Sequence, residues 1–127
     1  MTGADPAALE LVSLLPRTAR GPRREGIYAL WLTLRVAQDL LLDPPLQERI
    51  HRRRLASLET RLSSLTVPVP LRRALTAALL HLRDPRPESA AQVLSHLVAP
   101  AREAAGTEAA EALVQAARVL KQKLREK

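Results

Sequence analysis

The sequence contains no cysteine and no phenylalanine, and Tyr28 and Trp31 are its only aromatic residues. A chain without cysteine can form no disulfide and offers no thiolate for catalysis or metal binding, which fits a reducing compartment. Aromatic and β-branched residues, which favour strands, are scarce, whereas the strong helix formers Leu and Ala dominate. We therefore expect an all-α fold.

Catalytic and metal-binding patterns are also missing. The four glycines form no phosphate-binding loop, and no serine has a histidine and an acid placed as partners. His51, His81 and His96 share no metal-ligand spacing, and the Glu-x-x-His of di-iron bundles does not occur. His51 and His81 lie on or beside apolar stripes and are interpreted as packed or boundary residues rather than ligands. We expect no enzyme activity, no catalytic, cofactor-binding or metal-binding residue, and no small-molecule substrate.

Long apolar runs are absent as well. The N-terminus contains Asp5 and no apolar stretch, unlike a secretory signal. The most apolar segment, 27–42, is 16 residues long and contains Arg35 and Asp39, so it is too short and too polar to span a bilayer. A chain of 127 residues, 46% of them hydrophobic, suffices for one domain with one core. We expect a single helical domain over 1–127, cytoplasmic and without membrane contact.

Ten prolines divide the chain into helical segments. A proline that follows an aspartate, as in Asp43-Pro44, is typical of an N-cap and the first helical position. Two connections are predicted, a basic loop over 16–24 and a Pro-rich break over 66–70. The predicted helices are 5–15, 24–42, 43–65, 70–83, one that begins after Pro87 and that Pro100 kinks or ends, and one that begins at Thr107.

The segment 27–42 is predicted to be the central helix. Twelve of its 16 residues are apolar, and the polar Arg35, Gln38 and Asp39 fall on one narrow stripe. A helix that is apolar over most of its circumference must be surrounded by other helices. We expect a compact bundle of five to six helices in antiparallel hairpins. A weak internal similarity at an offset of 41 residues makes an α-solenoid-like stack the alternative.

The last predicted helix has marked ends. Gly106 is expected to stop the preceding helix in the αL conformation, and Thr107 to cap the new one. Lys121, Lys123 and Arg125 lie near its C-terminus, where cations complement the helix dipole. Its near-heptad apolar spacing favours pairing with a second copy of the chain.

Positive charge is concentrated in the middle of the sequence. The chain carries a formal net charge of +7, and residues 44–83 hold eight arginines against Glu48 and Glu59. Leu46, Ile50 and Leu80 diverge from the apolar stripes of their helices, which favours contact with a partner. Seven arginines are predicted to contact an acidic partner or phosphates. They are Arg49, Arg52, Arg53, Arg54, Arg72, Arg73 and Arg83.

Two functions fit these features. The first is a non-catalytic adaptor or assembly module that binds another protein or itself, with arginines attracting an acidic partner. The alternative is a small basic DNA- or RNA-binding protein that contacts phosphates through the helices of 44–83. The sequence lacks aromatic residues interleaved with arginines, which stack on single strands, and it lacks the known DNA-binding helix patterns. The adaptor is therefore the leading prediction.

Overall fold

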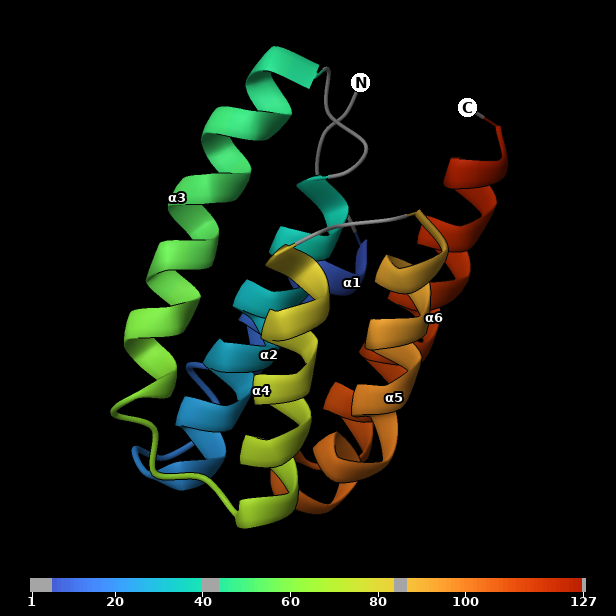
Figure 1. The fold of residues 1–127 in the computed structure, drawn as a ribbon. Coiled ribbons are helices and arrows are strands. Elements are labelled where there is room, and N and C mark those ends of the chain that lie inside the picture. Colours follow the sequence, from blue (N-terminus) through green and yellow to red (C-terminus); the bar gives the residue numbers. More distant parts are fainter. Residues whose placement is uncertain (1–5, 40–43, 84–86, 127) are drawn as a thin grey trace.

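The computed structural model describes residues 6–39, 44–83 and 87–126, which fold into helices with no strand. The all-α prediction is confirmed, and the helices pack compactly through contacts between distant parts of the sequence (Figure 1). Six helices lie in this part of the chain: α1 Pro6–Leu14, α2 Pro22–Gln38, α3 Pro44–Leu62, α4 Val69–Arg83, α5 Pro87–Ala105 and α6 Thr107–Arg125.

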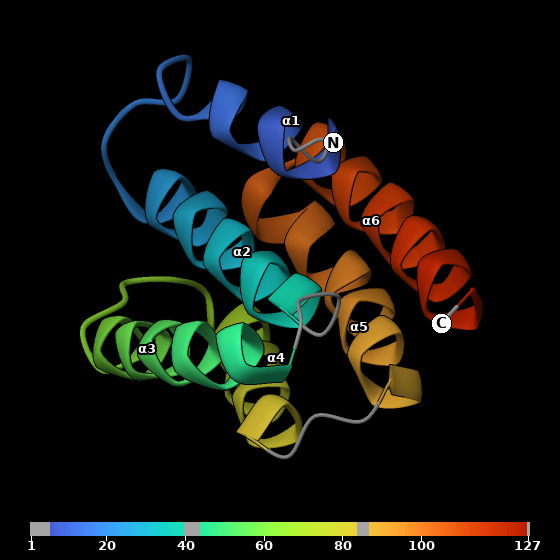
Figure 2. The same ribbon diagram turned by 90° about the horizontal axis from the view of Figure 1, so that it is seen from above.

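Helix α2 is the central helix, as its apolar sequence predicted. It contacts each of the other five helices, and its Ile27, Leu30 and Leu34 are at most 1% exposed. Full burial of such a side chain stabilises the fold by about 2 kcal/mol. Helices α1, α3, α4 and α5 surround α2, and α6 lies at the edge, packed mainly on α5 and α1 (Figure 2).

Several helix boundaries differ from the predicted ones. Helix α2 begins at Pro22, so the connection after α1, residues 15–21, is shorter than the predicted 16–24. The connection between α3 and α4, residues 63–68, begins and ends before the predicted break 66–70. Both helices have a proline in the first turn, Pro22 in α2 and Pro70 in α4, where its missing N–H loses no intrahelical hydrogen bond. Helix α5 passes through Pro100 and ends at Ala105, so this proline does not end the helix.

Gly106 forms the whole connection between α5 and α6. Its φ of 101° favours glycine, but its ψ of 169° is not that of the predicted αL stop. Gly106, rather than Thr107, is the N-cap of α6, and no side chain caps this helix. A Cβ atom on Gly106 would lie 2.6 Å from Nη2 of Arg23, whose Nε donates a 3.3 Å hydrogen bond to the carbonyl of Ala105. Arg23 thus caps the C-terminus of α5 by binding its last carbonyl oxygen.

Candidate functional site

The arginines predicted to form one contact surface are divided among several roles. Arg54 donates to the carboxylate of Asp39 over 2.5 Å, and this aspartate side chain is only 2% exposed. Arg72 donates to the carbonyl oxygens of Leu62 and Leu65 and so supplies hydrogen bonds to carbonyl groups at and just beyond the C-terminus of α3. Both guanidinium groups therefore stabilise the fold and are not free to bind a partner.

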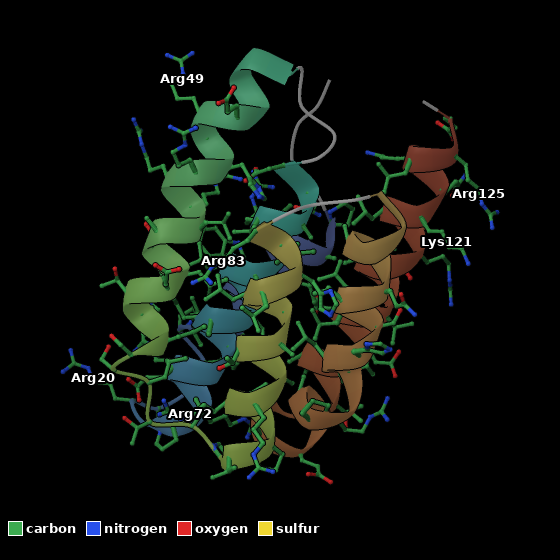
Figure 3. All side chains as sticks on the ribbon, viewed as in Figure 1. Arg20, Arg49, Arg72, Arg83, Lys121 and Arg125 are labelled. Atoms are coloured by element: carbon green, nitrogen blue, oxygen red, sulfur yellow. The ribbon has the colours of Figure 1, made fainter. Side chains whose placement is uncertain are left out.

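Two more of these arginines form ion pairs at the surface. Arg52 lies 3.0 Å from Glu48 on the same helix, and Arg83 of α4 pairs with Glu59 of α3. Figure 3 shows Arg83 between α3 and α4, while Arg49 extends into solvent. The members of the predicted set without an ion pair to another described residue are Arg49, Arg53, Arg72 and Arg73, and of these only Arg72 donates to backbone carbonyl oxygens. Carboxylates of described residues thus neutralise three of the seven predicted arginines.

The apolar residues of the predicted contact set do not share one environment. Leu80 is 60% exposed, Ile50 is half-buried, and the side chain of Leu46 lies outside the described residues. Val69 is also exposed on α4, 11 residues before Leu80 and so about 16 Å away along the helix. Single exposed apolar side chains at such a distance are ordinary surface features.

Asp39 and His51 form a buried polar cluster that the sequence did not predict. The Nε2 atom of His51 donates to the carbonyl of Leu82 over 2.8 Å, and its Nδ1 atom lies 3.8 Å from Oδ2 of Asp39. The neighbouring carboxylate of Asp39 raises the pKa of His51 most, and burial opposes this shift. The cluster connects α2, α3 and α4. His51 is buried, as interpreted from the sequence, whereas His81 is exposed.

An open groove lies between α5 and α6, with a volume of about 890 Å³. Its floor is apolar: Ala91 and Val98 come from α5, and Val114, Ala117 and Leu124 from α6. The two alanines are 8% exposed, whereas the larger floor residues are half-buried. We call this feature the α5–α6 groove. Its floor offers apolar surface that a partner could cover.

The two rims of the α5–α6 groove differ in charge. The α5 rim carries the neutral Gln92 and Ser95, and the α6 rim carries Arg118, Lys121 and Arg125. These cations are exposed, and no carboxylate of a described residue lies within 4.0 Å of them. Figure 3 shows Lys121 and Arg125 on the outer side of α6. The rim is therefore a row of positive charge that no carboxylate of a described residue neutralises.

Sequence reasoning missed this groove. It assigned Lys121 and Arg125 to the negative end of a helix dipole and did not consider Arg118. A signal was present, because Arg118, Lys121 and Arg125 follow one another at intervals of three and four residues and therefore share one edge of a helix. Their position beside an open apolar floor depends on which helix packs against α6.

Other kinds of site find little support in the described ranges. Within them, no three His, Cys, Asp or Glu side chains come together as ligands for a metal ion. None of the helices there combines the length and apolarity needed to cross a bilayer. No protein-family model, curated protein or solved structure matches the chain. The function must therefore be argued from the surfaces of the molecule.

Proposed function

We propose that the protein is a non-catalytic interaction module that binds an acidic protein partner in the α5–α6 groove. The observation that carries this proposal is an open apolar floor beside three cations that have no ion pair among the described residues. Covering the floor would supply affinity, because apolar surface is removed from water. The cations would attract and orient an acidic partner without first breaking an ion pair to a described residue.

Phosphate binding by the helices of 44–83 has less support. Four of the seven arginines that would contact phosphate interact instead with Asp39, Glu48, Glu59 or backbone carbonyl oxygens. Arg49, Arg53 and Arg73 remain, a smaller set than sequence-independent phosphate binding usually employs. This alternative is retained as an outcome of the test below.

The test is affinity capture from cells of the source organism with the immobilised full chain. Bound proteins are compared for the wild type, the Lys121→Glu/Arg125→Glu variant and a Lys123→Glu control. Lys123 is exposed on the same helix but does not line the α5–α6 groove. We expect an acidic partner that the double variant loses and the control retains. Circular dichroism of all three chains is the control for folding.

Two results of this experiment would count against the proposal. Equal retention of every bound protein by the double variant would mean that the α5–α6 groove binds none of them. Loss of all bound proteins after nuclease treatment, together with salt-sensitive binding of the chain to nucleic acid, would favour the phosphate-binding alternative.

A further inference from the structure

We infer that the partner enters the α5–α6 groove as an amphipathic α-helix with a row of acidic residues along one edge of its apolar face. This inference rests on the proposed function and specifies the form of the partner. It follows from the spacing of the floor residues, from their size, and from the arrangement of charge on the α6 rim.

The floor repeats at the interval of two helical turns. Ala91 and Val98 are seven residues apart on α5, and Ala117 and Leu124 are seven residues apart on α6. Seven residues of α-helix span about 10.5 Å. A helix with apolar residues at positions i, i+3 or i+4, and i+7 presents side chains at this same interval. An extended peptide has a two-residue side-chain period and would not match it.

Small side chains let a third helix approach closely. Ala91 and Ala117 each contribute only a methyl group, whereas Val98, Val114 and Leu124 are larger and half-buried beside them. Helices pack with their axes about 8–10 Å apart, and the nearer distances require small residues at the contact. The incoming helix would therefore sit in the valley between α5 and α6 and form a three-helix arrangement with them.

The charge on the α6 rim is a row rather than a cluster. Arg118, Lys121 and Arg125 span seven residues, about 10.5 Å along α6. Acidic residues at i, i+3 or i+4, and i+7 of a helix that runs along α6 would face all three cations. A single carboxylate or phosphate headgroup would engage only part of this row, so the row favours a helix over a single-chain lipid.

Charge also argues against a second copy of the chain as the occupant. The chain carries a formal net charge of +7, and pairing the α6 rims of two copies would bring six cations together. Like charges at such an interface are unfavourable. An acidic helix from a different protein gains the opposite interaction, so the structure favours a heterologous partner over the self-pairing that the heptad spacing of α6 predicted.

The probe for the test is a labelled synthetic peptide of about 15 residues, long enough to cover roughly 20 Å as a helix. It carries leucines on one face and glutamates at i, i+3 and i+7 on the edge of that face. A scrambled peptide of the same composition is its control. Fluorescence anisotropy with the full chain measures binding. We expect the amphipathic peptide to bind about tenfold more tightly than the scrambled one.

Variants of the full chain locate the binding site of the peptide. Ser95→Trp fills the α5–α6 groove from its neutral rim and is expected to weaken binding about tenfold, whereas Gln115→Trp, at an exposed position of α6 outside the groove, leaves it unchanged. Lys121→Glu/Arg125→Glu is expected to weaken binding by a similar factor, and Lys123→Glu by less than about threefold.

The outcomes separate the two proposals. Equal binding of the amphipathic and scrambled peptides would overturn the helical form, and the proposed function would still stand if the captured partner depends on Lys121 and Arg125. If the two peptides bind equally and no captured partner depends on Lys121 and Arg125, both the helical form of the partner and the proposed function are overturned. Displacement of the peptide by oleate at equal concentration would assign the groove to a single-chain lipid. A dimer in light scattering that Ser95→Trp dissociates would assign it to a second copy.

Discussion

Replacing Arg54 by methionine is expected to lower the free energy of unfolding by about 3 kcal/mol. The guanidinium group lies 2.5 Å from Oδ1 of Asp39, whose side chain is only 2% exposed. Methionine keeps most of the apolar stem but leaves this carboxylate without its arginine. Removing one partner of a buried ion pair costs about 3–5 kcal/mol, and the 29% exposure of Arg54 places the expected cost at the lower end of this range.

Arg52 provides a matched control on the same helix. It forms a 3.0 Å ion pair with Glu48, but the two side chains are 80% and 74% exposed. Water screens such a pair, so Arg52→Met is expected to change the free energy of unfolding by less than about 0.5 kcal/mol. The two substitutions remove the same chemical group and differ mainly in the burial of the partner carboxylate.

Urea unfolding followed by far-ultraviolet circular dichroism measures both effects. With an m value of about 2 kcal/mol per molar urea, Arg54→Met should lower the midpoint by about 1.5 M and Arg52→Met by less than about 0.3 M. Adding Asp39→Asn to Arg54→Met removes the unpaired charge and should restore at least about 1 kcal/mol. Two results would refute this reasoning. One is an equal loss of unfolding free energy in Arg54→Met and Arg52→Met. The other is a double variant whose loss equals the sum of the losses in Arg54→Met and Asp39→Asn alone.

Three further outcomes are expected. Because the pKa of His51 is raised above 6.5, its contribution to stability is complete below this pH and is lost as the pH rises through the folded-state pKa; the stability advantage of the wild type over His51→Gln should therefore shrink as the pH rises above 6.5, and a constant difference would contradict it. Gly106→Ala should cost about 1–3 kcal/mol in thermal unfolding, because φ is 101° and its Cβ would clash, and more than Gly21→Ala, which has open space; the reverse order would be inconsistent with this geometry. In urea unfolding, Leu30→Ala should cost about 3 kcal/mol at its fully buried position and Leu80→Ala less than about 0.5 kcal/mol at its exposed one, and similar costs would place Leu80 in the core.

The helical elements could be predicted because their signals are local. Prolines mark helix starts through their fixed φ and missing N–H, as predicted at Pro44; Pro22 also begins a helix, although it was assigned to the loop 16–24. The nearly all-apolar segment 27–42 identified the central helix, because such a surface must be covered on most sides. The predicted helix boundaries were in error by a few residues, because a boundary depends on the geometry of a single turn, such as the one at Gly106.

The roles of individual polar residues could not be predicted in the same way. Asp39 shares a stripe with Arg35 and Gln38 in the sequence, but it is buried because α3 places Arg54 and His51 against it. The spacing distinguishes the two arginines only weakly: Arg54 lies four residues before the buried Leu58 and so borders its stripe, whereas Arg52 lies farther round the helix. Their difference depends on which side of α3 faces α2.

The amino-acid sequence by itself determined that this chain is helical, which segment lies at the centre, and that α6 carries cations along one edge of an apolar stripe. These properties follow from residue type and from the 3.6-residue period of a helix. Only the tertiary structure decided which arginines are neutralised and that the α5–α6 groove stays open beside Arg118, Lys121 and Arg125, which form no ion pair with a described residue. The physical reason is that burial and ion pairing depend on distances between separate helices, which no local pattern specifies.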